Sequence, residues 1–388
     1  MKSFHKHHQV IVIGGGPAGL SAAYELARRG VEFLILEKGA QAGSSFQRFP
    51  KNIFFGPWLN NMLPGSKVAL NWVPRRSTQP AYSHYLIQYC EKNHLPMLPN
   101  ASVEGLEQHS DGSFLLRTNH GDMTADVVVN ATGYFSKPFI PDYPGLRETA
   151  IPTMHVADYR EPRTVRDRLD REQGRILVVG KRLSAGETFC ELHRAGYNVA
   201  LSFRGKLLFG PSRWQETLIS PIVYVWERLA VMLRLKLNSF PRMAGGLSER
   251  LVSQGLVPTF PNISRFEKNA VVFEDGRRES FDLVIFATGY QAAIDHLPID
   301  AKGSWLKEME STAMPGLFFL GVDGQRTYRS RFLRGLVEDS SVLAEKVAKR
   351  VASLRPLAKP TLLPVPIEER IFEPLEDEAY ETAGVESH

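Results

Sequence analysis

The chain reads Val10-Ile11-Val12-Ile13-Gly14-Gly15-Gly16-Pro17-Ala18-Gly19-Leu20 near its start and continues directly into the helix-forming segment 21–30. An apolar β-branched run, a glycine turn and a helix, in that order, are typical of the first βαβ unit of a dinucleotide-binding fold. In the spacing Gly14-x-Gly16-x-x-Gly19, one glycine makes the tight turn, one lets the backbone approach a pyrophosphate, and one packs the helix on the strand. The helix start then offers free N–H groups and a positive dipole end to the phosphates. We therefore predict a dinucleotide site held by Gly14, Gly15, Gly16, Pro17, Ala18 and Gly19.

A second apolar run, 33–36, ends at Glu37, which lies 23 residues after Gly14. A carboxylate at the end of this strand is placed to accept hydrogen bonds from an adenosine ribose, with Lys38 directly beside it. Strand, glycines, helix, strand and terminal acid all occur in the required order, which favours this interpretation over an ordinary glycine-rich turn. We interpret the unit as the seat of a bound FAD.

Composition indicates a multidomain globular protein. The chain has 388 residues, of which 43% are hydrophobic and 23% are charged, so it can form two to three domains with a large core. Its opening residues lack the pattern of a signal peptide, so we expect a cytoplasmic protein. Cys90 and Cys190 lie 100 residues apart without a C-x-x-C motif, and we interpret both as buried structural residues rather than a redox pair.

Charge is distributed unevenly along the chain. The net formal charge is +5, but eight acidic residues against a single arginine from residue 368 onward give that tail −7, which leaves about +12 on the rest. A basic body suits anionic cofactors. We find no recognisable nucleic-acid-binding module and expect no specific nucleic-acid partner. No clustered metal-ligand pattern stands out, so we expect no metal.

A second glycine loop follows the buried run 176–179. It reads Gly180-Lys181-Arg182-Leu183-Ser184-Ala185-Gly186, and the next strand ends at Arg204 rather than at an acid. An arginine there is what a ribose 2′-phosphate requires, so NADPH is favoured over NADH, with Gly180, Ser184 and Arg204 as its contacts. Arg182 occupies the place of the middle glycine, where a side chain crowds a pyrophosphate unless the loop swings outward. The alternative is a nucleotide-free remnant of such a domain.

Two further regions carry small residues after a buried strand. Residues 127–134 and 282–290 each end in Ala-Thr-Gly-Tyr, and small residues there let the backbone approach a ligand, which makes Thr132, Gly133, Thr288 and Gly289 candidate contacts. The strand 316–323 closes on Gly321-Val322-Asp323, and we expect a long helix through Arg350 after it. The aspartate is placed to accept hydrogen bonds from a ribityl chain, and the helix start to face the flavin; a capping aspartate without a ligand is the alternative.

The remaining segments are less specific. Residues 39–71 are rich in glycine, proline and aromatics, and these rings either cover a flavin or form core. A helix is expected over Pro80–Asn93 with tyrosines at helical spacing, and an antiparallel β-meander over Val103–Val129. The insertion 207–250 contains an apolar helical stretch whose embedded charges argue against a membrane span. A packed helix or dimer contact, a cover for a substrate entrance, and a peripheral membrane contact through 217–237 all remain open.

Taken together, these motifs resemble those of two-dinucleotide-domain flavoproteins, over about residues 8–350. The chain looks most similar to flavin-containing monooxygenases and the plant YUCCA-type enzymes. This resemblance implies FAD bound by the first glycine loop, with Phe46 at the place of a family tryptophan, and NADPH bound by the second. It also implies insertion of one oxygen atom from O₂ into a small apolar or heteroatom-containing substrate through a C4a-(hydro)peroxyflavin. His155, which with Tyr159 matches part of a family fingerprint, is the candidate hinge residue, cofactor contact or catalytic residue; a merely structural histidine is the alternative.

Departures from these families leave alternatives open. Thr149 and Ile151 occupy the fingerprint's Phe and Gly places, and Arg182 is similar to a feature of bacillithiol-disulfide-reductase-like flavoproteins, although Ala18 stands where those carry a cysteine. The second hypothesis is an NAD(P)H-dependent flavin reductase of a disulfide, quinone or protein partner. The third is a catalytically silent FAD-binding sensor or assembly protein.

The expected architecture is α/β, with an FAD domain that carries an inserted NAD(P)H domain and a small antiparallel β-meander. We place the FAD domain at 1–150 and 266–352, the NAD(P)H domain at 151–265 with the insertion 207–250, and a proline-rich acidic tail at 353–388.

Overall fold

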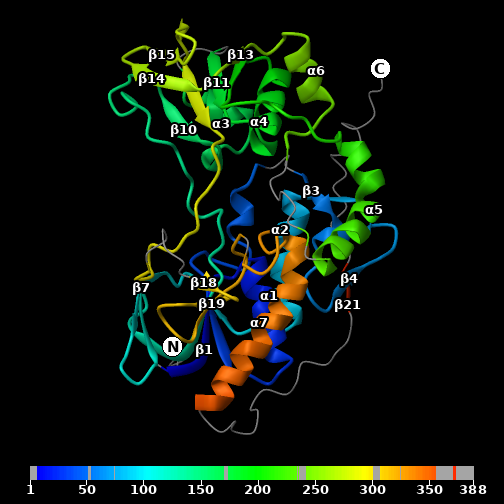
Figure 1. The fold of residues 1–388 in the computed structure, drawn as a ribbon, viewed down its shortest axis with the longest axis vertical. Coiled ribbons are helices and arrows are strands. Elements are labelled where there is room, and N and C mark those ends of the chain that lie inside the picture. Colours follow the sequence, from blue (N-terminus) through cyan, green and yellow to red (C-terminus); the bar gives the residue numbers. More distant parts are fainter. Residues whose placement is uncertain are drawn as a thin grey trace.

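The computed structural model describes residues 7–50, 54–73, 75–169, 174–233, 235, 242–299, 306–323, 325–354 and 370–372. The chain forms two α/β units (Figure 1). It builds most of the first unit, crosses to the second, and returns to complete the first with the long C-terminal helix α7. The fold class expected from the sequence is confirmed.

Five parallel strands form the centre of the first unit. They are the apolar runs seen in the sequence, and in such a sheet both faces are covered, so the strands are buried on both sides. Two short antiparallel strands extend one edge, and two more pair beside β9 as the expected meander. In spatial order the central strands are β20 (Leu317–Phe319), β9 (Met123–Asn130), β1 (His7–Ile13), β2 (Phe33–Leu36) and β6 (Met97–Leu98); the antiparallel ones are β18 (Leu306–Lys307), β19 (Glu310–Ser311), β7 (Val103–Gln108) and β8 (Phe114–Thr118).

Alternate residues of β1 face different layers. Val10 and Val12 belong to the apolar cluster formed with the helices, whereas Ile11 and Ile13 belong to the cluster on the meander side. The helices are α1 (Pro17–Ala27), α2 (Gln79–Lys92) and α7 (Leu333–Leu354). The helix expected over 80–93 is thus confirmed as α2, and its tyrosines are buried packing residues.

Smaller elements complete the first unit between α1 and α2 and along its edge. They are two short 3₁₀ turns, the antiparallel pair β3 and β5, and the parallel pair β4 and β21. Their bounds are η1 (Phe46–Arg48), η2 (Trp58–Asn60), β3 (Phe54–Pro57), β5 (Arg76–Thr78), β4 (Ser66–Val68) and β21 (Arg370–Phe372).

The second unit repeats this plan. A parallel sheet is covered by helices on one face and by a three-stranded antiparallel sheet on the other. The parallel strands, in spatial order, are β10 (Thr153–His155), β17 (Leu283–Phe286), β11 (Arg175–Val179), β12 (Asn198–Ser202) and β13 (Thr259–Phe260); the others are η3 (Val156–Asp158), α3 (Pro162–Arg166), α4 (Leu183–Arg194), α6 (Leu247–Ser253), β14 (Ile263–Glu267), β15 (Ala270–Phe273) and β16 (Arg278–Glu279).

The boundary of the second unit differs from the expected one. β17, which was expected in the FAD domain, lies between β10 and β11 in the second sheet, so this unit continues to residue 286 rather than ending at 265. An all-apolar strand carries no signal for which parallel sheet it joins.

Helices were expected within the insertion 207–250 and through Arg350, and the structure has a helix in each segment. α5 (Arg213–Met232), inside the predicted insertion, reaches back to the start of α7 through ion pairs, and Figure 1 shows it beside the first unit. The long helix expected through Arg350 is confirmed as α7, which begins at Leu333; in the loop before it, Arg326 and Arg329 form ion pairs with Asp339 and Glu338 of the helix. Most of the tail at 353–388 lies outside the described residues.

Candidate functional site

The first glycine loop lies at the carboxyl edge of the first sheet, between β1 and α1. Gly14 has φ +107°, and a Cβ there would lie 2.8 Å from the carbonyl oxygen of Ala131. A Cβ on Gly19 would lie 1.8 Å from the carbonyl oxygen of Gly14. Both glycines are therefore required by the protein itself, one for the turn and one for the close packing of helix on strand.

Gly16 is different, because its surroundings are open. It is the N-cap of α1 with φ −80°, which any residue adopts, and the atom nearest to a Cβ placed there would be Ser45 Oγ, at 4.0 Å. The open space lies at a helix start whose N–H groups face outward. No contact within the protein requires residue 16 to lack a side chain. The glycine therefore fits a place where the pyrophosphate of a dinucleotide approaches the backbone closely.

Glu37 is held across the loop by two backbone donors. Its Oε2 accepts from the N–H of Gly15 at 2.6 Å, and its Oε1 accepts from the N–H of Gly39 at 2.7 Å. A carboxylate has about four acceptor positions, so two remain for ribose hydroxyls. Lys38 is exposed beside it. These residues fit the adenosine end of FAD.

The predicted ribityl contact lies against the same loop. A Cβ on Gly321, which has φ +86°, would lie 3.4 Å from the Cβ of Ala18. The N–H of Asp323 donates to the hydroxyl of Tyr134 at 3.1 Å, and its Oδ2 accepts from Nη1 of Arg331 at 3.2 Å. Sequence reasoning missed Tyr134 and Arg331 because nothing in their spacing joins them to Asp323.

Phe46 belongs to the protein core. Its side chain is 5% exposed, and its ring centroid lies 5.2–5.4 Å from those of Phe49, Phe55 and Tyr82. The structure therefore shows core packing for Phe46, and its contact with a cofactor stays a prediction.

The second glycine loop tolerates its arginine. Gly180 has φ +152°, and a Cβ there would lie 2.5 Å from the carbonyl oxygen of Ala287, so this glycine is required. Arg182 is the N-cap of α4 in an extended conformation, φ −118° and ψ −172°, which places no strain on a side chain. Ser184 lies half-buried in the first turn of α4.

Cations gather around this second loop. Lys181 Nζ donates to the carbonyl oxygen of Arg204 at 2.8 Å, so these two residues lie together at the end of β12. Burial, and then the positive charge of Arg331 from the first unit, lower the pKa of Arg182. The cations of the two units therefore face the same region, which favours an elongated polyanion. Lys181 was also missed, although it adjoins Arg182.

The Ala-Thr-Gly-Tyr residues lie in the two segments that cross between the units. The Thr132 hydroxyl donates to the carbonyl oxygen of Ala293 at 2.7 Å, and the Thr288 hydroxyl donates to that of Phe139 at 2.5 Å. Gly133 and Gly289 both have positive φ, with nothing within 4 Å of a built Cβ. The threonine hydroxyls thus join the crossover segments.

His155 also serves this junction. Its Nδ1 accepts from the N–H of Ala157 at 3.0 Å, so Nε2 carries the proton and donates to the carbonyl oxygen of Gly289 at 3.0 Å. Burial lowers its pKa, which keeps the ring neutral. Of the roles predicted for His155, these contacts support that of a hinge residue, because they connect the end of β10 to the segment that returns to the first unit.

A second histidine predicts how stability depends on pH. Burial lowers the pKa of His296 to about 4 from 6.5, and its Nε2 lies 3.0 Å from Asn130 Oδ1. Between these values the unfolded chain binds more protons, so stability falls as pH falls from 6.5 and levels off below about 4. The variant His296→Gln retains an N–H donor. Its free energy of unfolding, measured with urea, should change over this pH range by roughly 2 kcal/mol less than that of the wild type. An unchanged slope would contradict this assignment.

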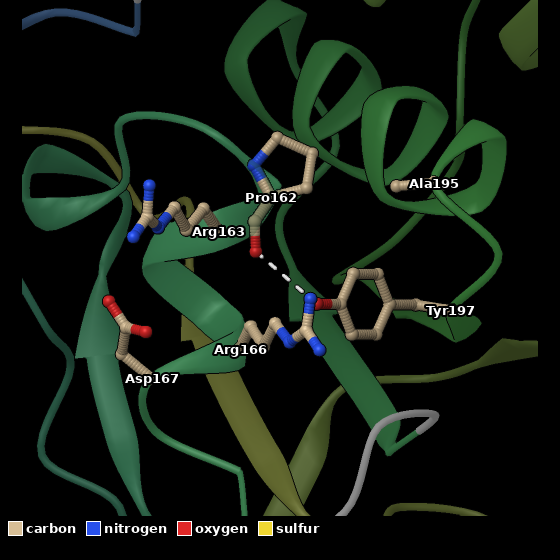
Figure 2. Close-up of a pocket in the computed structure, with 6 residues that line it drawn as sticks. All are labelled: Pro162, Arg163, Arg166, Asp167, Ala195 and Tyr197. Carbon is tan, nitrogen blue, oxygen red and sulfur yellow. Dashed lines mark hydrogen bonds between the residues drawn. The ribbon is translucent and has the colours of Figure 1, made fainter.

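A separate cavity of about 480 Å³ lies on the second unit between α3 and the end of α4 (Figure 2). It is lined by Pro162, Arg163, Arg166, Asp167, Ala195 and Tyr197, and the Tyr197 hydroxyl donates to the carbonyl oxygen of Pro162 at 3.3 Å. This hollow is at the opposite end of α4 from the glycine loop, so it is not part of the nucleotide site. Within the described residues, no cluster of three or more potential metal ligands occurs.

Comparison with known proteins identifies relatives along most of the chain. Residues 11–321 match the family model of the pyridine nucleotide-disulphide oxidoreductases. An uncharacterized CzcO-like oxidoreductase from Geobacillus kaustophilus is 27% identical over 353 residues, covering 87% of this chain and 97% of that protein. The probable indole-3-pyruvate monooxygenase YUCCA4 from Arabidopsis thaliana is 24% identical, covering 87% and 89%.

Solved structures share the fold. A flavin-containing monooxygenase from Stenotrophomonas maltophilia superposes with a TM-score of 0.72 at 21% identity, covering 89% of this chain and 99% of that one. A bacillithiol disulfide reductase from Bacillus cereus gives 0.68 at 20% identity with the same coverage. The resemblance to two-domain flavoproteins, with monooxygenases among them, is confirmed.

Proposed function

Because the chain belongs to the pyridine nucleotide-disulphide oxidoreductase family, we propose that it is an FAD-dependent monooxygenase driven by NADPH. The first glycine loop, Glu37 and Asp323 hold FAD, and the second loop holds the nicotinamide nucleotide. The substrate is a small apolar or heteroatom-containing molecule, and the second substrate is O₂. The resemblance to both flavin-containing and YUCCA-type monooxygenases supports this reaction class.

When bound, FAD accepts hydride from NADPH and activates O₂ for transfer of one oxygen atom. The chain's own tasks are to bind, orient and exclude water. Gly16 leaves space for the pyrophosphate, Glu37 offers acceptors to the ribose, and α1 directs its positive end at the phosphates.

The observation that carries the choice of NADPH is the group of cations around the second loop. Lys181 and Arg204 lie together at the end of β12, where a 2′-phosphate is expected. Arg182, the N-cap of α4, adds a third positive charge, which is near enough to Arg331 of the first unit for the two charges to interact. We assign Lys181 and Arg204 to the 2′-phosphate, and Arg182 and Arg331 to the pyrophosphate. The guanidinium of Arg182 then takes the place of the close backbone contact that a glycine would allow.

The reductase alternative meets an obstacle in the cysteines. The sequence contains only Cys90 and Cys190, both buried, in the apolar clusters of different units. Burial raises the pKa of Cys90 to about 11, which suppresses its thiolate. A reductase of this chain would therefore pass electrons from flavin directly to a quinone or protein partner, without a dithiol of its own. The third hypothesis, a catalytically silent FAD-binding sensor or assembly protein, predicts that neither NADPH nor NADH reduces the bound flavin.

Removal of Arg204 tests the nucleotide assignment. In Arg204→Ala, KM for NADPH should rise roughly tenfold or more, because a charge-assisted contact to the 2′-phosphate is lost, whereas KM for NADH should change little. Arg194→Ala, an exposed arginine at the far end of α4, is the matched control and should affect neither. Steady-state oxidation of the two nucleotides measures this. Equal losses with both would place Arg204 outside the 2′-phosphate site.

A further inference from the structure

Helix α5 presents an apolar face to the outside of the molecule. Seven large side chains at helical spacing are 39–72% exposed, and together they cover about four turns. They are Leu218, Ile222, Val225, Trp226, Leu229, Met232 and Leu233. A continuous apolar surface of this kind is unusual on a monomeric globular protein and indicates an interaction site.

The opposite face of α5 is fixed to α7. Glu227 is 7% exposed and accepts from Nε and Nη2 of Arg334 at 2.5 and 2.6 Å. Ala230 is fully buried one turn away, and Arg228 reaches Glu338 at 3.8 Å. A buried ionic contact of this geometry sets the rotation of the helix, because rolling it inward would leave Glu227 without its partner. The apolar face is therefore held outward.

Charge identifies the occupant of this face. Segment 205–242, which leaves out Arg204, contains six Lys and Arg residues against two acidic residues. A segment with net positive charge and an apolar helix face complements an anionic lipid surface, whereas two copies packed through α5 would bring two like-charged segments together. In the described part of the chain, no helix is long and apolar enough to cross a bilayer.

We propose that α5 docks on the surface of an anionic bilayer, lying in the plane of the interface. The seven apolar side chains named above, six on α5 and Leu233 directly after it, enter the boundary between headgroups and acyl chains, and basic residues of the segment lie at the headgroups. The two units remain on the aqueous side. This docking goes beyond the proposed oxidation and does not depend on it.

Vesicle flotation of the full-length, FAD-loaded protein tests the proposal. Binding is expected to vesicles of phosphatidylcholine with phosphatidylglycerol and to weaken in pure phosphatidylcholine and at high salt. Ile222→Glu/Met232→Glu should weaken binding roughly tenfold or more, because two exposed apolar anchors become acidic. The matched control, Leu70→Glu/Leu256→Glu, adds the same charges at exposed leucines elsewhere and should bind like wild type.

Tryptophan fluorescence locates the membrane contact on the protein, and the oligomeric state tests the alternative that a second copy of the chain covers α5. Quenching of tryptophan emission by brominated acyl chains should fall in Trp226→Phe, because Trp226 lies on the docking face. Light scattering measures whether the free protein is a dimer. Absence of binding to anionic vesicles, equal binding by both double variants, or a dimer that Ile222→Glu/Met232→Glu splits without any vesicle binding would each overturn the proposal.

Discussion

Gly19→Ala should produce a protein that fails to retain FAD. A Cβ at this position would lie 1.8 Å from the carbonyl oxygen of Gly14, a backbone atom that can move only if α1 shifts away from β1. Such a shift opens the loop that positions the helix start, so we expect a loss of FAD affinity of roughly hundredfold or more, together with lower stability. The flavin absorbance of the purified protein measures the loss.

Gly16→Ala provides the informative comparison. The space around Gly16 is open in the chain itself, and its backbone suits alanine. Stability of the FAD-free protein should therefore change by less than about 1 kcal/mol, while FAD affinity falls roughly tenfold as the methyl group enters the pyrophosphate space. If Gly16→Ala binds FAD like wild type, the phosphate does not lie at this glycine. If Gly19→Ala retains FAD, close packing of α1 on the loop is not required for the site.

Glu227→Gln should be the most destabilising single substitution in the contact between α5 and α7. Arg329 is 2% exposed and lies 3.8 Å from Glu227, and Arg334 binds the same carboxylate with two nitrogens. Removing the negative charge leaves the buried guanidinium of Arg329 and the partly buried guanidinium of Arg334 with less compensation, at a cost of about 3 kcal/mol. Urea unfolding at neutral pH measures this difference.

Glu345→Gln is the matched control on α7. Its carboxylate pairs with Lys349 one turn away at the surface, and exposed pairs of this kind contribute little to stability. Similar losses in the two variants would mean that the Glu227 contact is no stronger than a surface pair. In that case this contact would not fix the rotation of α5.

Local patterns were sufficient to predict the nucleotide-binding architecture. Strand, glycines and helix follow one another within about twenty residues in each unit, so the order of these elements and the close contact of Gly19 with Gly14 are encoded in adjacent sequence. Side chains of β1 alternate between two faces of the sheet, but polar and apolar residues do not alternate in its sequence, because both faces are buried. The helix α2 was recognisable because its tyrosines recur at helical spacing.

Long-range arrangement could not be predicted in the same way. The ion pair of Glu227 and Arg334 joins residues 107 positions apart, and the local sequence around neither residue predicts its partner. The same limitation hid the approach of Arg331 to Asp323 and placed β17 in the wrong sheet. An amphipathic pattern gives two faces to α5, but only the anchored Glu227 shows which face is outward.

The arginine in the second glycine loop has a structural explanation. Its extended backbone needs no glycine, and its charge lies toward that of Arg331 from the other unit. Arg331 is paired with Asp323, and an anion bound near both arginines would also reduce the repulsion between them. The departure from the glycine pattern is thus compatible with a working nucleotide site, in which a guanidinium replaces a backbone contact.

Rapid-mixing spectroscopy of the purified full-length protein tests the proposed monooxygenase function. We expect that the protein is isolated with FAD, that NADPH reduces it faster than NADH, and that admission of O₂ produces a transient spectrum distinct from both reduced and oxidised flavin. Return to oxidised flavin in one step, with immediate release of hydrogen peroxide, would contradict monooxygenase function. A protein that neither binds FAD nor accepts hydride from NADPH would contradict the assignment of both nucleotide sites.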